Sequence, residues 1–204
     1  MSLEMKNMML TKDVLPFKKA LLEGKVVSFP TETVMGLGAT FDNQEAYELL
    51  NKVKNRPEDK PYTLMLGNKE DIEKYAYVSR RDKKIIDAFV PGPITLLLNA
   101  KNVVPSYVTH NTGVIGVRVP AMKEICELIN ALGKPLLVPS ANKSGEAPCK
   151  TYQEVLEVFK DEVACIYEKD ALGDKPSTIV DLTGENIKII REGSLSLETI
   201  RSVL

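Results

Sequence analysis

The chain has 204 residues, of which 44% are hydrophobic and 27% are charged, and its formal net charge is -1 at pH 7. This composition suits one folded domain with a sizeable core and argues against intrinsic disorder. The near-zero charge excludes a global basic field for nucleic acid, though not a local basic patch, and no apolar run approaches the ~18 residues of a membrane span.

Cysteine and histidine chemistry is restricted in this chain. The cysteines, Cys126, Cys149 and Cys165, lie far apart, and no Cys-x-x-Cys pair occurs. We therefore expect no disulfide framework and no structural zinc site, but reduced cysteines in a cytoplasmic protein. The single histidine, His110, lies in the segment YVTHNTG, which is typical of a surface loop. Any mechanism with a histidine base would have to use it.

Helical and extended patterns alternate in the first half of the chain. Gly24 fits a helix end, apolar residues from Ala46 to Val53 follow helical spacing, and Ser79 with Asp82 forms a capping-box pattern. In chain order, these patterns predict a helix at 13–22, a strand at 26–29, a helix at 43–54, a strand at 62–66, a helix at 79–89 and a strand at 94–98.

The second half continues the alternation and becomes richer in strands. Gly133 fits another helix end, Thr151 with Glu154 forms a second capping-box pattern, and LTGEN at 182–186 indicates a hairpin. The predicted elements are a strand at 114–119, a helix at 122–132, a strand at 136–138, a helix at 151–159, strands at 163–166, 178–182 and 187–190, and a helix at 197–203. This order predicts an α/β or α+β fold around a mixed sheet, as a single domain over 1–204.

A first polar loop, PTETVMGLG, follows the strand at 26–29 and is expected to lead into a helix. Thr31 and Thr33 offer hydroxyls, and Gly36 and Gly38 allow close backbone approach or positive φ. The spacing matches neither a Walker loop nor a dinucleotide-binding fingerprint. Taken alone, the segment is explained equally well as an ordinary strand-to-helix connection.

A second loop, KNRPEDKP, brings three cations, Lys54, Arg56 and Lys60, close together after a helix end. Compensation of the helix dipole is one explanation for them. Pro57 and Pro61, however, restrict the loop, and restrained cations suit anion binding better than mobile ones. Arg56 is suited to gripping a carboxylate or phosphate in bidentate fashion.

Two further loops add hydroxyl, amide and guanidinium groups. VPSANKSG presents Ser140 and Asn142 after a short strand, where an anion site and a simple polar turn are both compatible with the residues. Ser177 precedes one predicted strand, and Arg191 ends the next, where it is either a ligand or a snorkelling edge arginine. Together the four loops favour a nucleotide and a small acid, held by charge and placement.

The same loops occur in an order and spacing that resemble the YrdC/Sua5 family, the threonylcarbamoyl-AMP synthases. Each segment is weakly specific, but their combination, from about residue 24 to 193, is highly specific, and it is similar to the short, single-domain members. The matching segments are FPTETVMGLG, KNRPEDKP, PGPIT, GVRVP, PSANKSG, PSTIVD and REG.

This resemblance implies a fold and a reaction. The implied fold is a YrdC-like twisted open sheet with a concave, positively charged groove. The implied enzyme is a nucleotidyltransferase that uses L-threonine, bicarbonate and ATP to make threonylcarbamoyl-AMP and pyrophosphate. Mg²⁺ would be carried by ATP, without a metal site on the protein. The product would pass to a separate transferase machinery that modifies tRNA, in the cytoplasm and without a membrane.

The resemblance also implies roles for individual residues, although the division of the cations between the two substrates stays open. Lys54 and Arg56 would be catalytic, and Thr31 is an additional candidate ligand. The residues implied for threonine are Thr33, Arg118, Ser140 and Ser177. The residues implied for ATP are Arg56, Lys60, Asn142, Lys150 and Arg191.

The chain departs from the family pattern at Met35, where the family usually has tyrosine, and at Val90, where it usually has tryptophan. A thioether in place of a phenol changes the polarity of the pocket. A rival function for the same fold is an RNA-binding or ribosome-associated module without synthase activity. A similar domain is also embedded in the much larger carbamoyl-transfer enzymes of hydrogenase maturation, and a fold relative with degenerate sites is a third rival.

Overall fold

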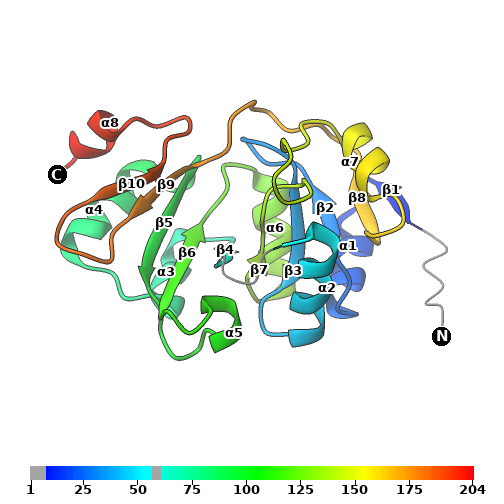
Figure 1. Cartoon of the computed structure of the whole chain (residues 1–204), viewed down its shortest axis with the longest axis horizontal. Coiled ribbons are helices and arrows are strands. Elements are labelled where there is room, and N and C mark those ends of the chain that lie inside the picture. Colours follow the sequence, from blue (N-terminus) through cyan, green and yellow to red (C-terminus); the bar gives the residue numbers. More distant parts are fainter. Residues whose placement is uncertain (1–7, 57–60) are drawn as a thin grey trace.

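A computed structural model describes residues 8–56 and 61–204 and confirms a single mixed sheet with helices on both sides (Figure 1). In the described residues the strands are β1 (Met9–Thr11), β2 (Val27–Phe29), β3 (Gly36–Thr40), β4 (Thr63–Met65), β5 (Ile94–Asn99), β6 (Val114–Arg118), β7 (Leu136–Leu137), β8 (Cys165–Tyr167), β9 (Thr178–Asp181) and β10 (Lys188–Arg191). The helices are α1 (Val14–Leu22), α2 (Gln44–Lys54), α3 (Ile72–Tyr75), α4 (Arg80–Phe89), α5 (Ser106–Thr109), α6 (Lys123–Leu132), α7 (Tyr152–Phe159) and α8 (Leu197–Arg201), with a 3₁₀ turn at Lys69–Asp71.

The longer helices begin and end where their local signals predict. Asp13 and Asn43 accept backbone hydrogen bonds at the starts of α1 and α2. The two predicted capping boxes open α4 and α7. Gly133 ends α6 with a φ of 77°, in the left-handed region that favours glycine. These ends are determined by side chains within a few residues, which is why the sequence predicts them well.

The strands form one ten-stranded sheet in the order β1-β8-β2-β3-β7-β4-β6-β5-β9-β10 among the described residues. Parallel pairs (β1 with β8, β2 with β8, β4 with β6, β5 with β9) occur beside antiparallel ones, so the sheet is mixed as predicted. The predicted hairpin at LTGEN joins β9 and β10. Segments distant in the sequence, such as β3 and β7, thereby become neighbours.

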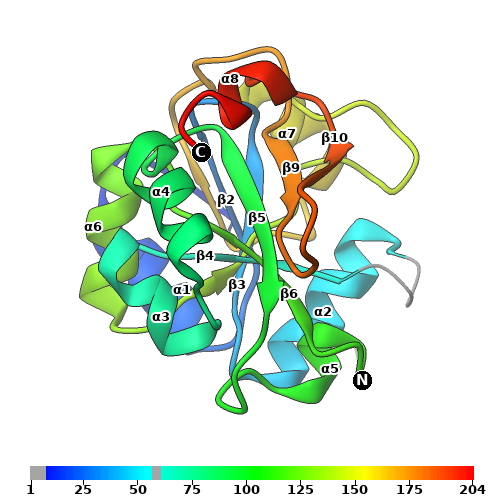
Figure 2. The same ribbon diagram turned by 90° about the vertical axis from the view of Figure 1, so that its left-hand side faces the viewer.

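Helices cover both faces of the sheet. Figure 2 shows α1, α3, α4 and α6 on one side and α2 with α5 on the other. One core contains Phe17 of α1 and Leu128 and Ile129 of α6, together with Phe29 of β2. A larger core includes residues of α2, α4 and α7 together with most of the sheet. Among the described helices, none combines the length and the apolar character that a bilayer crossing requires.

The expectation of a helix after PTETVMGLG is wrong, because Gly36–Thr40 forms strand β3, which pairs antiparallel with β2. The glycines explain the outcome. A Cβ on Gly36 would lie 2.9 Å from Cγ1 of Val138, and one on Gly38 would lie 2.6 Å from Cε1 of Phe29. Their role is therefore close packing inside the sheet rather than a turn at positive φ.

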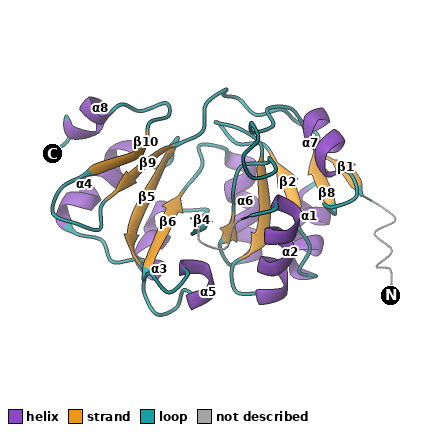
Figure 3. Ribbon diagram, viewed as in Figure 1, coloured by secondary structure: helices purple, strands orange, loops and turns teal. Residues whose placement is uncertain are grey.

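The remaining differences concern short or displaced elements. The sequence patterns do not predict β1, α3 or α5, each of which has three or four residues. Strand β8 lies at Cys165–Tyr167, shifted from the predicted 163–166, because its parallel pairing with β1 and β2 sets the register. The segment from β8 to β9 crosses the upper side of the molecule, joining the two halves of the sheet (Figure 3).

Candidate active site

A cavity of about 170 Å³ lies where the polar loops meet. Its walls come from the loop after β2, the end of α2, the end of β6, the loop after β7 and the two strands of the β9–β10 hairpin. The structure thus brings together most of the residues predicted from the sequence. The predicted residues that line the cavity are Thr31, Thr33, Lys54, Arg56, Arg118, Ser140, Ser177 and Arg191.

Thr31 orders the loop that carries Thr33. Oγ1 of Thr31 donates to the carbonyl of Val34 at 2.7 Å and accepts from the amides of Thr33 and Val34. The two threonine hydroxyls are 2.7 Å apart, and either one can be the donor. Oγ1 of Thr33 then accepts from Nη2 of Arg118 at 2.9 Å. Thr31 is buried in this network and orients Thr33.

Lys54 connects α2 to the loop after β7. Its side chain is only 4% exposed. Nζ donates to the carbonyl of Ser140 at 2.7 Å and to the carbonyl and Oδ1 of Asn142 at 3.0 and 2.9 Å. A buried ammonium bound to these acceptors is well suited to hold positive charge at a fixed point, and poorly suited to accept a proton.

Arg56 stacks on Tyr62 at the other end of this wall. The guanidinium carbon lies 4.3 Å from the centre of the Tyr62 ring, and Nη2 donates to the carbonyl of Pro61 at 2.8 Å. The Tyr62 hydroxyl donates to Oδ1 of Asn51 at 2.6 Å, and burial raises the pKa of Tyr62. Stacking and hydrogen bonding together restrain the guanidinium. Lys60, predicted from the same loop, lies outside the described residues.

Arg191 reaches the cavity from the end of β10. Its Nη2 and Nε donate to the carbonyl of Ser177 at 2.8 and 3.2 Å, and Oγ of Ser177 lies 2.9 Å from Oγ1 of Thr95. Burial, and secondly the charge of Arg118, lower the pKa of Arg191. The two guanidinium groups therefore repel one another within the same cavity, and an anion between them would relieve that repulsion.

Gly193 allows the Arg191 segment to pack closely against Ser177, and a substitution at Gly193 tests this packing. A Cβ there would lie 2.2 Å from the carbonyl oxygen of Pro176 and 2.7 Å from the backbone of Ser177. We expect Gly193→Ala to lower the free energy of unfolding by about 1–3 kcal/mol, because backbone cannot yield like a flexible side chain. Chemical denaturation would measure this change.

The matched control is Gly184→Ala, in the turn of the same hairpin, where a Cβ would meet nothing within 4 Å. That variant should stay within about 0.5 kcal/mol of the unmodified protein. Equal destabilisation by both substitutions would contradict the close-packing role of Gly193.

The cavity is strongly cationic. Of its described lining residues, Lys54, Arg56, Arg118 and Arg191 are basic and none is acidic. Hydroxyls of Thr33, Ser140 and Ser177 stand among them. Cations restrained in a partly enclosed cavity stabilise anionic ligands far better than exposed ones do. The arrangement is therefore suited to carboxylate and phosphate groups.

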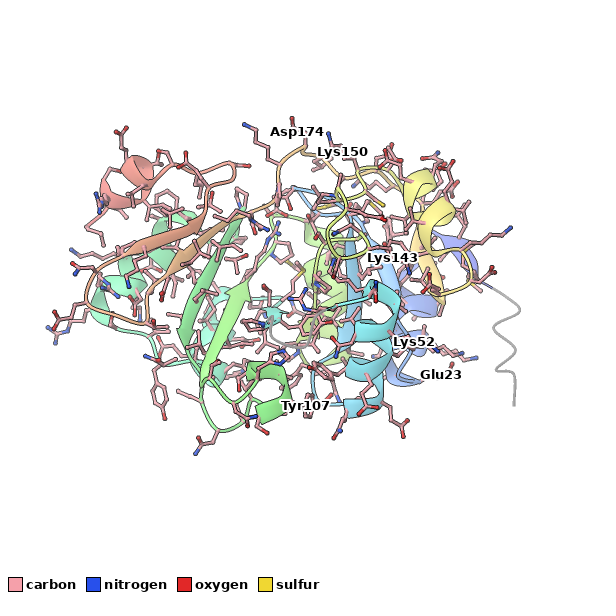
Figure 4. The ribbon with its side chains drawn as sticks, in the orientation of Figure 1. Glu23, Lys52, Tyr107, Lys143, Lys150 and Asp174 are labelled. Carbon is pink, nitrogen blue, oxygen red and sulfur yellow. The ribbon has the colours of Figure 1, made fainter. Side chains whose placement is uncertain are left out.

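Two predicted residues lie outside the cavity lining. Asn142 is buried, but its side chain is used within its own loop, where Oδ1 accepts from Lys54 and from Oγ of Ser140, and Nδ2 donates to the carbonyls of Lys143 and Glu146. Lys150 is exposed and lies with Asp174 at the upper edge of the molecule (Figure 4).

The neighbourhood of Met35 is apolar. Met35 is fully buried and lines the cavity, and its amide donates to the carbonyl of Cys149 at 3.0 Å. The cysteines are free, as expected, and burial raises the pKa of Cys149 to about 11, so its thiol stays protonated near neutral pH. Neither residue offers a nucleophile to the cavity.

Sequence reasoning missed three residues near the site. Tyr62 and Thr95 line the cavity, and Glu32 forms an ion pair with Arg118 at 2.9 Å. Tyr62 sits inside a predicted strand and resembles an ordinary core residue. Thr95 and Glu32 lie in motifs that the sequence singled out, but no local signal shows which partner each one meets.

Known proteins resemble the chain in sequence and in fold. The sequence profile of the Sua5/YciO/YrdC family, described as "Telomere recombination", matches residues 19–193. A threonylcarbamoyl-AMP synthase of Vibrio campbellii is 36% identical over 179 residues, covering 86% of this chain and 96% of that protein.

Two solved structures share the fold. The crystal structure of Pyrococcus abyssi Sua5 complexed with L-threonine matches with a TM-score of 0.91 at 31% identity, over 97% of this chain but only 60% of that longer chain. Escherichia coli YciO, at 24% identity, shares the fold with a TM-score of 0.87 over 95% of this chain and 98% of its own. With a family profile that spans most of the residues and a relative matched over nearly its whole length, the chain belongs to the Sua5/YciO/YrdC family of threonylcarbamoyl-AMP synthases.

Proposed function

We propose that the cavity binds L-threonine, bicarbonate and ATP and joins them into threonylcarbamoyl-AMP. The threonine amine adds to bicarbonate with loss of water, and an oxygen of the resulting carbamate attacks the α-phosphorus of ATP. The bond from that phosphorus to the bridging oxygen breaks, and its electron pair leaves with pyrophosphate. The observation that carries this proposal is the cationic cavity without lining carboxylates among the described residues, since every reactant here brings anionic groups.

Threonine is proposed to bind beside Arg118. A guanidinium can hold a carboxylate through two parallel hydrogen bonds, and Arg118 lines the cavity next to the hydroxyl of Thr33. Ser140 and Ser177 add hydroxyls on the neighbouring walls. The threonine complex of Pyrococcus abyssi Sua5, a relative of the same fold, supports a threonine site in this family.

ATP is proposed to enter with its phosphates first. A volume of about 170 Å³ is smaller than the ~300–1,000 Å³ of pockets that bury drug-sized ligands, so the adenosine would extend beyond the cavity. Lys54 and Arg56 would stabilise the charge that develops around the α-phosphorus. The residues proposed to contact the nucleotide are Arg56, Lys60, Asn142, Lys150 and Arg191.

Mg²⁺ is proposed to arrive on the ATP phosphates. Among the residues that the structure describes, no group of three or more His, Cys, Asp or Glu side chains is placed to hold a metal ion. Since the described cavity lining has no carboxylate, the ion would be coordinated mainly by substrate oxygens. When bound there, the ion neutralises charge on the phosphates.

The product is proposed to pass to a tRNA-modifying transferase system.

Pyrophosphate release tests this function. With ATP, Mg²⁺ and bicarbonate, the full chain should release pyrophosphate only when threonine is added, and EDTA should stop the release. Absence of threonine-dependent release would overturn the proposal. If the inactive protein instead bound RNA with an affinity that fell steeply with salt, an RNA-binding function would replace it.

A further inference from the structure

Glu32 forms an unusually buried ion pair with Arg118. Oε1 of Glu32 lies 2.9 Å from Nη2 of Arg118, and the side chains are 12% and 9% exposed. In the other ion pairs of the described residues, at least one partner is more than a quarter exposed. Burying two charges costs several kcal/mol before their attraction is counted, so the pair is weak evidence for a purely stabilising role.

The Glu32 carboxylate pairs with Arg118 without being part of the cavity lining. Arg118 lines the cavity, whereas Glu32 does not. Within the described residues, the two carboxylate oxygens of Glu32 and Nε of Arg118 meet no partner in hydrogen-bond geometry. The contact between the two side chains is therefore mainly electrostatic. Such incompletely satisfied buried groups are uncommon in folded proteins and call for an explanation.

Backbone packing holds the loop that carries Glu32. A Cβ on Gly173 would lie 2.6 Å from the carbonyl oxygen of Glu32, so the segment from β8 to β9 presses directly on this loop. The amide of Leu172 also donates to the carbonyl of Thr31 at 3.1 Å. The backbone from which the Glu32 side chain extends is thus held in place by the fold.

A negative partner matters for Arg118 because a second cation, Arg191, lines the same cavity. The two guanidinium charges repel. The pKa of Arg191 is lowered mainly by burial and secondly by the charge of Arg118. The negative charge of Glu32, paired with Arg118, opposes that repulsion. The hydroxyl of Thr33, 2.9 Å from Nη2, restrains the same nitrogen. Arg118 is therefore held on one side and can present its remaining donors to a ligand.

We propose that Glu32 is a positioning residue for the amino-acid substrate, which acts by holding the Arg118 guanidinium in place for the threonine carboxylate. This inference rests on the proposed function, in which Arg118 binds threonine. Glu32 itself does not touch the substrate. Removal of its charge should therefore weaken threonine binding and leave ATP binding unchanged.

The test compares Glu32→Gln with the unmodified protein by steady-state pyrophosphate release. We expect the KM for threonine to rise about tenfold, comparable to the loss when the outer hydrogen-bond partner of a metal ligand is removed. The KM for ATP and the kcat at saturating threonine should change less than about threefold. In an Arg118→Lys background, the same substitution should raise the threonine KM less than about twofold, because coupled residues are not additive.

The matched control is Glu124→Gln, which breaks an ion pair of the same 2.9 Å length with Lys169 on the surface, and it should leave both KM values unchanged.

If Glu32→Gln does not fold in a thermal unfolding scan, Glu32→Asp keeps the charge on a shorter side chain and should still raise the threonine KM several-fold. Unchanged or tighter threonine binding in the folded variant, or an additive effect with Arg118→Lys, would overturn the proposal. An unmodified protein that does not use threonine would overturn the proposed function instead.

Discussion

Replacing Arg118 with glutamine is expected to lower kcat/KM for threonine by ~100-fold or more, because removing one partner of a desolvated charge pair in a binding site costs about 2–5 kcal/mol. The same change should lower the free energy of unfolding by about 3–5 kcal/mol, since it leaves the buried carboxylate of Glu32 without its countercharge. Pyrophosphate release at varied threonine and denaturant-induced unfolding measure the two effects.

The double variant Glu32→Gln/Arg118→Gln separates these two effects. Without either charge, no uncompensated ion stays buried at this pair, so most of the lost stability should return. Activity should not return, because the cation proposed to bind the threonine carboxylate is still missing. An Arg118→Gln protein that keeps the normal threonine KM would contradict the proposed role of Arg118.

Replacing Lys54 with methionine should reduce pyrophosphate release by ~100-fold or more, the loss that follows removal of a preorganised charge or donor at a reacting centre. Methionine fills similar space but leaves the carbonyl of Ser140 and the oxygens of Asn142 without the ammonium. Each buried acceptor that loses its partner costs about 1–3 kcal/mol, so stability should fall as well. The measurements are single-turnover kinetics and chemical unfolding.

Lys143→Met is the matched control for Lys54. Lys143, labelled in Figure 4, also connects the same loop to α2, since its Nζ donates to the carbonyl of Val53 at 2.6 Å. Lys143 also forms a partly exposed ion pair with Glu162, and it does not line the cavity. We expect this variant to lose less stability than Lys54→Met, because its ion pair is partly exposed, and to keep its activity. Equal loss of activity in both variants would show that loop attachment, rather than charge in the cavity, is what Lys54 provides.

The apolar surroundings of Met35 explain why methionine is tolerated where the family usually has tyrosine. The side chain is fully buried, and Met65 and Val138 line the same cavity, so the thioether continues an apolar wall. A flexible, unbranched side chain adapts well to such a wall. Tyr62, which directly precedes β4, supplies a phenol elsewhere in the cavity lining, although its hydroxyl is bound to Asn51.

Local signals predict the longer elements because their causes are local. Helices α1, α2, α4 and α7 each begin at a residue whose side chain caps the first turn, and the apolar spacing of α2 and α6 matches the faces that they bury. The sequence carries no clear strand signal at β3, because Gly36 and Gly38 have low strand propensity. Their place in the sheet depends on close contact with Val138 and Phe29, from other strands or their ends.

By itself, the sequence determined the inventory of the site, since the cations and hydroxyls of the polar loops can be identified by residue type and spacing. Only the tertiary structure decided how they are paired. It paired Glu32 with Arg118, bound Lys54 to the loop of Asn142, and set Arg191 against Ser177. The physical reason is that ion pairs and hydrogen bonds act over a few ångströms in space, and the sheet brings together residues that are far apart along the chain.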